Sequence, residues 1–378
     1  MNKKKIVFLT GTRADFGKLK SLIKIAEKCD DFCVYIYATG MHMNAKYGRT
    51  VDEIYKSGFK NIFEFINHDT IEHMDRTLAK TIEGFSFYVS DIQPDLIVVH
   101  GDRTEALAGA IVGSLNNILV AHIEGGEISG TVDELIRHAV TKLSHVHLVA
   151  NEEAKKRLVQ LGEHQDSIWV IGSPDLDLMN PKSLPNLNFV MDYYGLNFKK
   201  FALGIFHPIT TEYKYIKNYV SNFVDALINT GHNYVLIYPN NDIGSIEILQ
   251  EFERLNDNDR FKIFPSLRFE YFLTLLRNCT YIVGNSSAGI REAPYYNVPS
   301  IDIGTRQQNR ATFNSIFKSG YKTNDILQAI EKCTTYKSTN DKFKDYFGEG
   351  QSDKMFLKLL ENGEIWKIKH QKQFQDIK

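Results

Sequence analysis

The chain has 378 residues, 43% of them hydrophobic, which is enough for two or three domains with buried cores. Its 45 basic residues nearly balance its 46 acidic ones, and a formal net charge of -1 creates no global field that would favour nucleic acid or a membrane surface. The four cysteines are few, and we interpret them as reduced thiols.

The start of the chain lacks the pattern of a signal peptide. The apolar stretch after Met1–Lys5 stops at Thr10, and charged residues follow. The longest nearly apolar window, 106–123, is interrupted by one serine and two asparagines, which favours a helix, a turn and a strand over a membrane span. We therefore expect a cytoplasmic protein that binds neither a membrane nor nucleic acid.

Strand-like and helical stretches alternate along most of the chain, which indicates an α/β fold with parallel strands. The first series of expected strands lies near 6–10, 33–39, 96–100, 118–123, 145–150 and 167–172, with helices such as 17–28 and 71–90 between them. A second series lies near 201–206, 233–238, 261–264, 281–284 and 299–303.

A domain boundary is expected between the two series, because the alternation is lost over 173–200, where three prolines occur. We expect an N-terminal Rossmann-like domain over 1–180 and a C-terminal one over 181–362. The last residues, 363–378, are expected to form a helix packed across the two domains, or otherwise a frayed tail.

Polar clusters follow the expected strands in both halves. They are Gly11–Asp15, His100–Arg103, His122–Glu127, Phe206–Pro208, Tyr238–Asn240, Gly284–Gly289 and Gly304–Arg306. In an open parallel sheet, ligands bind in the crevice beyond the carboxyl ends of the strands. Two such halves facing a central cleft predict an enzyme.

The Gly284–Glu292 segment carries the clearest ligand pattern. It follows an expected strand and opens an expected helix, so Ser286, Ser287 and Gly289 would present hydroxyls and free backbone N–H groups to an anion. Glu292 would accept hydrogen bonds from ribose hydroxyls. The alternative is an ordinary serine N-cap with a first-turn acidic residue. The glycine spacing matches neither the Walker A nor the dinucleotide pattern, which favours a nucleoside diphosphate.

A second ligand-binding turn is expected at Arg13, whose guanidinium would pair with phosphate or stack on a base. The alternative there is a surface turn with an Arg–Asp ion pair. Phe272 and its aromatic neighbours open an expected helix, where they would sandwich a base or simply pack in the core.

Acid–base candidates lie at the ends of the expected central strands. Asp102 and Glu124 each follow such a strand, and we expect partial burial and mutual repulsion to raise the pKa of one of them toward neutrality. The alternatives are a helix cap for Asp102 and an arginine salt bridge for Glu124. The remaining candidates are Asp133, Glu134, His100, His122, His138 and His207, and Asp133 is also spaced to pair with Arg137 along a helix.

Six of these motifs, in this order, resemble those of the hydrolysing UDP-N-acetylglucosamine 2-epimerases of bacterial sialic acid synthesis. They are Gly11–Asp15, His100–Arg103, His122–Glu127, Asp133–His138, Phe206–Pro208 and Asn285–Pro294. The resemblance spans about the whole chain. It implies two Rossmann-like domains of the GT-B type, an active site in the interdomain cleft, and homodimers or homotetramers. Non-hydrolysing relatives have Gly-Thr-Arg-Pro-Glu and His-Val-Glu-Ala-Gly where this chain has Ala14-Asp15 and Gly125-Gly126, which favours the hydrolysing branch.

The resemblance also implies residue roles. The catalytic residues would be Asp102, Glu124, Asp133 and His207, with His207 beside the sugar and the leaving diphosphate. The diphosphate would bind Ser286, Ser287 and Arg13. The ribose would bind Glu292, and the uracil would stack on Phe272 with Arg13. Glu134 and Gly289 complete the substrate-binding set.

The implied reaction converts UDP-N-acetylglucosamine and water to N-acetylmannosamine and UDP through a 2-acetamidoglucal, with no redox cofactor and no metal. Three alternatives stay open. One is the same reaction on UDP-2,4-diacetamido-2,4,6-trideoxyglucose for legionaminic acid synthesis. The others are a GT-B glycosyltransferase and a non-catalytic nucleotide-sugar sensor, although a sensor would not need several carboxylates.

Overall fold

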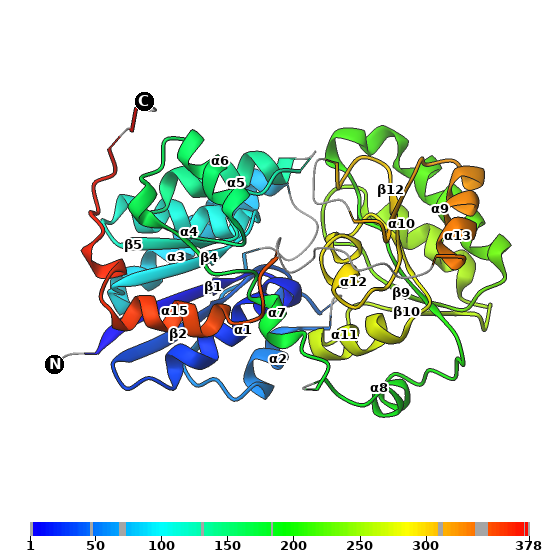
Figure 1. Cartoon of the computed structure of the whole chain (residues 1–378), viewed down its shortest axis with the longest axis horizontal. Coiled ribbons are helices and arrows are strands. Elements are labelled where there is room, and N and C mark those ends of the chain that lie inside the picture. Colours follow the sequence, from blue (N-terminus) through cyan, green and yellow to red (C-terminus); the bar gives the residue numbers. More distant parts are fainter. Residues whose placement is uncertain are drawn as a thin grey trace. The chain divides into compact units, whose positions relative to one another are not determined.

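The computed structural model of the chain describes residues 3–45, 48–67, 73–129, 132–182, 184–308, 313–336, 347–373 and 375–376. The chain folds into two compact units, each built on a parallel sheet (Figure 1). Unit 1 comprises Met1–Glu127, Asp133–Asn180 and Lys344–Lys378, and unit 2 comprises Ile128–Val132 and Pro181–Phe343. The α/β prediction is therefore confirmed.

Unit 1 contains a seven-stranded sheet in the order β3-β2-β1-β4-β5-β6-β7, with every neighbouring pair parallel. Its strands are β1 (Lys4–Thr10), β2 (Phe32–Ala38), β3 (Ile62–Glu64), β4 (Leu96–His100), β5 (Leu119–Ile123), β6 (Val146–Val149) and β7 (Ile168–Val170). Its α-helices are α1 (Arg13–Glu27), α2 (Val51–Lys56), α3 (Met74–Ile92), α4 (Thr104–Leu115), α5 (Val132–Leu143), α6 (Glu152–Gln160), α7 (Asp175–Leu178) and α15 (Ser352–Glu361). Its 3-10 helices are η1 (Gly40–Met43), η3 (Gln165–Ser167) and η7 (Ile365–Lys367).

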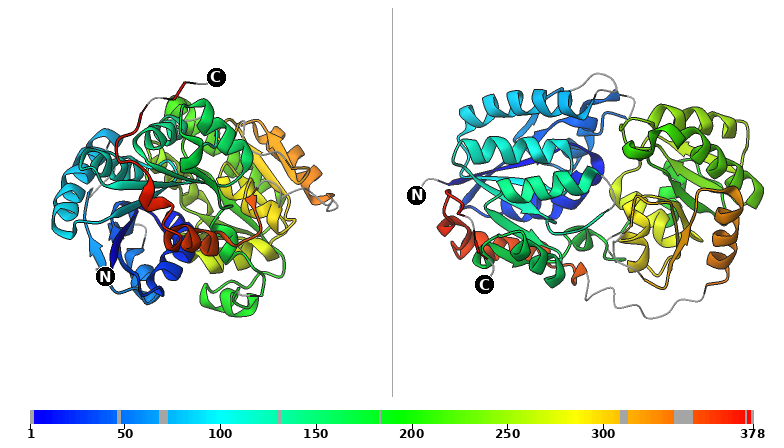
Figure 2. Two further views of the ribbon diagram at one scale, coloured as in Figure 1. Left: turned by 60° about the vertical axis from the view of Figure 1, so that its left-hand side comes forward. Right: turned by 90° about the horizontal axis from the view of Figure 1, so that it is seen from above.

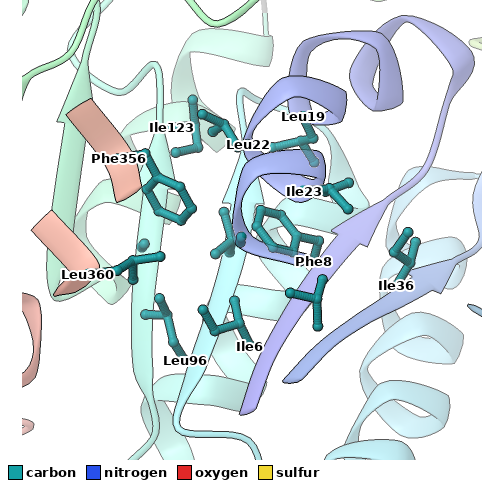
Figure 3. Packing of buried hydrophobic residues seen from close by; sticks show 14 of the residues in the cluster. Ile6, Phe8, Leu19, Leu22, Ile23, Ile36, Leu96, Ile123, Phe356 and Leu360 are labelled. Atoms are coloured by element: carbon teal, nitrogen blue, oxygen red, sulfur yellow. The ribbon is translucent and has the colours of Figure 1, made fainter. Parts of the chain in front are cut away.

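The two faces of this sheet are covered by different helices (Figure 2). Successive side chains of a strand point to opposite faces. Ile6 and Phe8 of β1 therefore pack against α1 and α15, as Figure 3 shows. Tyr37 of β2 packs instead against Phe85 of α3, with the ring centroids 4.8 Å apart. Both faces are thus apolar, as expected for a parallel sheet buried on both sides.

The C-terminal part of the chain returns to unit 1, which differs from the expected boundary at residue 362. Phe356 of α15 lies edge-on to Phe8, with the ring centroids 6.2 Å apart, and Leu360 joins the same core. The expected helix over 363–378 is wrong for the described residues, which form only η7 and then a segment without helix. The amphipathic helix is instead α15, because its residues Phe356 and Leu360 are four positions apart and so lie on the one face that covers the sheet.

Unit 2 contains a six-stranded parallel sheet in the order β10-β9-β8-β11-β12-β13. Its strands are β8 (Ala202–Ile205), β9 (Tyr234–Ile237), β10 (Phe261–Phe264), β11 (Ile282–Gly284), β12 (Ser300–Ile303) and β13 (Ile316–Ser319). Its α-helices are α8 (Leu187–Tyr193), α9 (Ile216–Thr230), α10 (Ser245–Phe252), α11 (Phe269–Asn278), α12 (Glu292–Tyr295) and α13 (Thr323–Thr334). Its 3-10 helices are η4 (Thr210–Tyr215), η5 (Glu253–Leu255) and η6 (Ser287–Gly289).

Candidate active site

Each sheet has a switch point, where neighbouring strands connect in opposite directions. In unit 1 this point lies between β1 and β4, and in unit 2 it lies between β8 and β11. Ligands of open α/β sheets bind beyond the carboxyl ends of the strands at such points. The turn that starts at Gly11 and the turn that contains Asp102 follow the first pair of strands, while His207 and Ser286 follow the second.

The side chain of His100, at the end of β4, lies between two carboxylates. Its Nδ1 is 3.0 Å from Asp15 Oδ1, and its Nε2 is 2.9 Å from Glu124 Oε2. Burial by itself would lower the pKa of His100, but the hydrogen bonds and charges of Asp15 and Glu124 raise it from 6.5 to about 9. His100 therefore carries a positive charge at neutral pH.

Glu124 has a second cation beside it and an unusual backbone conformation. Lys18 Nζ lies 3.7 Å from Glu124 Oε2 and 3.5 Å from Asp175 Oδ2. The φ angle of Glu124 is 62°, a left-handed conformation that is rare for a residue with a side chain. Such a conformation persists only where the surroundings fix it, here through the buried carboxylate and the N–H bond to Leu148 O.

Asp102 also faces a cation. The guanidinium of Arg137, from α5, donates to Asp102 Oδ2, and its NH1 donates to Glu127 O at 2.9 Å. Arg137 is only 2% exposed, so this ion pair is largely shielded from water on the arginine side. The nearby charge of Asp133 also helps to raise the pKa of Arg137, although burial opposes it.

Two interpretations of these carboxylates therefore need correction. Mutual repulsion between Asp102 and Glu124 was expected, but each lies beside a cation, and opposite charges favour the ionised form of a carboxylate. The alternative of a helix cap for Asp102 is also wrong, because α4 has Arg103 at its N-cap position and no side-chain cap. Glu124 pairs with Lys18 and His100.

His122, another acid–base candidate, has a structural role. Its Nε2 donates to Gly101 O at 2.8 Å, and its Nδ1 accepts from Thr141 Oγ1 at 3.1 Å. Burial lowers its pKa to about 3, so the ring is neutral and its one N–H holds the turn before Asp102. Two further candidates, Glu134 and His138, lie on α5 as an i,i+4 pair, with His138 Nε2 3.5 Å from Glu134 Oε1.

The turn after β11 in unit 2 begins with a close backbone approach. Gly284 has a φ of 142°, and a Cβ there would lie 1.9 Å from Ile205 O. Ser286 then caps η6 through its Oγ, which accepts from Ala288 N–H at 3.3 Å. The helix expected from the sequence is short, because α12 has only four residues and begins at Glu292.

Two other predicted ligand residues are more enclosed than the sequence indicated. Phe272 of α11 is 8% exposed, so most of its ring packs in the interior of unit 2. Arg13 forms an ion pair with Glu53 at 3.8 Å rather than with Asp15, and its side chain is 17% exposed. The alternative of a surface turn with an Arg–Asp pair is therefore wrong, since Asp15 binds His100 instead.

Sequence reasoning missed Lys18, Asp175 and Asn285. Lys18 is 8% exposed on the buried face of α1, and its i,i+4 spacing from the apolar Leu22 was a visible signal. Asp175 lies 157 positions later in the chain, so no local pattern connects it with Lys18. Asn285, which is fully buried, stands inside a quoted motif but had no assigned role.

No group of three or more His, Cys, Asp or Glu side chains suited to hold a metal ion occurs in the part of the chain that the structure describes. Among the same described residues, no helix is both long and apolar enough to cross a membrane.

Comparison with known proteins identifies the family. The family model for UDP-N-acetylglucosamine 2-epimerase matches residues 24–361. The chain belongs to this family. A relative from Neisseria meningitidis named UDP-N-acetylglucosamine 2-epimerase is 48% identical over 99% of both chains. A relative from Legionella pneumophila named UDP-N,N'-diacetylbacillosamine 2-epimerase (hydrolyzing) is 33% identical, over 94% of this chain and 95% of the relative.

The fold of the family is also found in solved structures. The UDP-GlcNAc 2-epimerase of Methanocaldococcus jannaschii, solved in complex with UDP-GlcNAc and UDP, matches with a TM-score of 0.81 and 21% identity. The match covers 95% of this chain and 100% of the other. The predicted architecture of two parallel-sheet domains of the GT-B type is thereby confirmed.

Proposed function

We propose that this protein is a hydrolysing epimerase that converts UDP-N-acetylglucosamine and water to N-acetylmannosamine and UDP. The observation that carries the proposal is the pair of carboxylates at one edge of the first sheet, Asp102 beside Arg137 and Glu124 beside His100. Inversion at carbon 2 by removal and return of a proton needs two acid–base groups. The 48% identity to a relative named for this substrate supports the choice of sugar. Supply to sialic acid synthesis rests on the resemblance to the hydrolysing enzymes.

The first half of the proposed reaction is an elimination. One carboxylate among Asp102, Glu124 and Asp133 removes the proton at carbon 2, and its bonding electrons form the double bond to carbon 1. The bond between carbon 1 and oxygen breaks, and its electron pair leaves with UDP. His207 stabilises the charge that develops on the departing oxygen.

The second half is an addition of water to the 2-acetamidoglucal. A second acid–base group delivers a proton to the opposite face of carbon 2 as the water oxygen bonds to carbon 1, and the proton that this water loses restores that group. The first carboxylate releases the proton that it took to solvent. Neither half changes an oxidation state overall, so the proposal needs only the side chains of this chain.

The proposed UDP contacts follow the resemblance. Ser286, Ser287, Gly289 and Arg13 would contact the diphosphate, while Glu292 would bind the ribose. Glu134 would contact the sugar. Phe272 would meet the base with the exposed edge of its ring, since little more of it is accessible. Ser286 Oγ accepts from the backbone N–H of Ala288 as an N-cap, and its hydroxyl proton can still be donated to a phosphate oxygen.

The experiment that tests this function is turnover of UDP-N-acetylglucosamine in deuterated water and in ¹⁸O-labelled water, with NMR and mass spectrometry of the released sugar. We expect deuterium at carbon 2 of N-acetylmannosamine and ¹⁸O at carbon 1. Product without deuterium would refute proton abstraction at carbon 2. Turnover only with an added acceptor sugar would indicate a glycosyltransferase, and binding without turnover a sensor.

A second candidate substrate is UDP-2,4-diacetamido-2,4,6-trideoxyglucose. It is favoured by the 33% identity to the relative named for UDP-N,N'-diacetylbacillosamine. Competition between the two nucleotide sugars in one reaction, with both free sugars quantified, decides between them. A higher kcat/KM for the diacetamido sugar would replace the first candidate.

The protein is further proposed to act in the cytoplasm as a homodimer or homotetramer. Phe87 of α3 is 72% exposed and Leu115 of α4 is 76% exposed, so the surface of unit 1 offers apolar side chains to a second copy. Sedimentation equilibrium of the full chain measures the assembly, and a monomer at micromolar concentration would contradict this part of the proposal.

A further inference from the structure

The buried side chain of Asn285 binds the backbone of His207 on both sides. Its Oδ1 accepts from His207 N–H at 2.6 Å, and its Nδ2 donates to His207 O at 2.8 Å. These two bonds continue the β8–β11 pairing, which ends where Gly284 lies opposite Ile205. The side chain of Asn285 thus extends the β8–β11 pairing one residue beyond its last Cα pair.

The main chain of Asn285 is itself held by the end of β8 and by the loop after β12. Its N–H donates to Ile205 O at 3.1 Å, and its C=O accepts from Gln307 Nε2 at 2.9 Å. The side chain of Asn285 therefore has a fixed origin, and its amide transmits that position to His207. A buried amide with both ends bonded is rigid, because any rotation would leave polar groups unsatisfied.

The Nδ1 atom of the His207 imidazole has a backbone partner. Its Nδ1 accepts from the backbone N–H of Asn240, at 3.0 Å. A backbone N–H can only donate, so Nδ1 must carry the lone pair. The proton of the neutral ring is then on Nε2, and protonation of Nδ1 would break this bond.

We infer that His207 works as a neutral hydrogen-bond donor through Nε2, and that Asn285 is its positioning residue. The inference rests on the proposed function for the identity of the acceptor, which is the oxygen of UDP that leaves carbon 1. As the bond from carbon 1 to this oxygen breaks, the electron pair moves onto UDP. Nε2–H then donates a hydrogen bond to that oxygen and keeps its proton, so UDP departs as the anion.

Replacement of Asn285 tests the positioning role. We expect Asn285→Ala to lower kcat about 10- to 100-fold, since a displacement of about 1 Å can cost a hundredfold in rate. The Kd of UDP-N-acetylglucosamine should change less than about threefold, because the oxygen that His207 contacts gains its negative charge only as the bond to carbon 1 breaks. Asn233→Ala is the matched control, since Asn233 is only partly buried, donates its amide to the carbonyl of Lys200 and precedes β9 at the other end of the sheet.

Replacement of His207 tests the neutral donor. Glutamine places an amide N–H near the position of Nε2 but cannot become a cation. We expect His207→Ala to lower kcat about 100- to 1,000-fold, and His207→Gln to recover at least about tenfold of this loss. If the two variants are equally slow, the ring acts as a proton donor and the inference is wrong.

A double-mutant cycle separates positioning from general support of the fold. In the His207→Ala background, Asn285→Ala should cost less than about threefold in kcat, because the group that it positions is gone. Equal costs in both backgrounds would show that Asn285 acts on the site in general and would overturn its positioning role.

NMR can determine which ring nitrogen of His207 carries the proton, without any turnover. Long-range ¹H–¹⁵N spectra at about pH 7.5, with the His207 signals assigned by their loss in His207→Gln, should show the proton on Nε2 and none on Nδ1. A protonated Nδ1 would refute the inference even in an active enzyme. The expected tautomer in a protein that fails the deuterium experiment would instead refute the proposed function and leave the ring assignment standing.

Discussion

The ion network around His100 should make the stability of unit 1 depend on pH. The pKa of His100 rises from 6.5 to about 9 in the folded protein. A raised folded pKa contributes stability that is complete below pH 6.5 and is lost as the pH rises through 9, because the folded state binds the proton more tightly. The shift corresponds to about 3 kcal/mol, of which nearly all is lost between about pH 6.5 and 9.5.

The perturbation is His100→Gln, which keeps a hydrogen-bonding side chain but removes the titration. Urea unfolding followed by tryptophan fluorescence is the assay, because the chain has 2 tryptophans and both, Trp169 and Trp366, belong to unit 1. The signal therefore reports the unit that contains His100, which matters since a two-unit chain need not unfold in one step. His164→Gln, at an exposed histidine of the same unit, is the control.

The unfolding free energy of the wild type should exceed that of His100→Gln by an amount that shrinks by about 3 kcal/mol between about pH 6.5 and 9.5. The difference between the wild type and His164→Gln should stay constant, since both keep His100. Other buried histidines titrate in every variant and cancel in the comparison. A wild-type advantage over His100→Gln that is the same at both pH values, within about 0.5 kcal/mol, would refute a charged His100 between Asp15 and Glu124.

Two further predictions concern the carboxylates and the second switch point. Asp102→Asn and Glu124→Gln should each lower kcat about 100- to 10,000-fold while the Kd of UDP stays nearly unchanged, and a loss below about tenfold in both variants would remove these residues from the catalytic set. Gly284→Ala should destabilise unit 2 by about 2–4 kcal/mol in thermal unfolding, because the new Cβ meets Ile205 O at 1.9 Å. Gly195→Ala isolates the cost of a positive φ alone, since no atom lies within 4 Å of its Cβ position, and an equal loss there would contradict the clash.

The central strands and the edge strands β7 and β10 could be predicted from the sequence, whereas the edge strands β3 and β13 could not. Central strands such as Leu96–His100 are buried on both faces, so they appear as unbroken apolar runs. The two strands that we missed, β3 and β13, lie at the edges of their sheets. β3 has three residues and an exposed Phe63, and β13 contains an exposed Lys318, so neither has the pattern of a buried strand.

The positions of the candidate site residues at strand ends could be predicted from the sequence, but their ion-pair partners could not. Asp102, Glu124 and His207 were found because each follows a strand at the edge where ligands bind. Their partners come from distant positions, since Arg137 lies on α5 and Lys18 on α1. The expected repulsion between two carboxylates was wrong for this reason: a sequence shows which charges are present, while the sheet order decides which of them meet.

Three histidines on neighbouring strands illustrate the same limit. His100, His122 and His147 lie on β4, β5 and β6, and all three are largely buried. His122 meets a carbonyl and a hydroxyl, so burial prevails and its pKa falls to about 3. His147 contacts one carboxylate, Glu163, but lysines share that carboxylate, and its pKa is also lowered. Only His100 has two carboxylates at hydrogen-bond distance, and only its pKa rises. Burial is common to all three, so the number of carboxylates at hydrogen-bond distance from each ring decides which histidine can hold a positive charge beside Glu124.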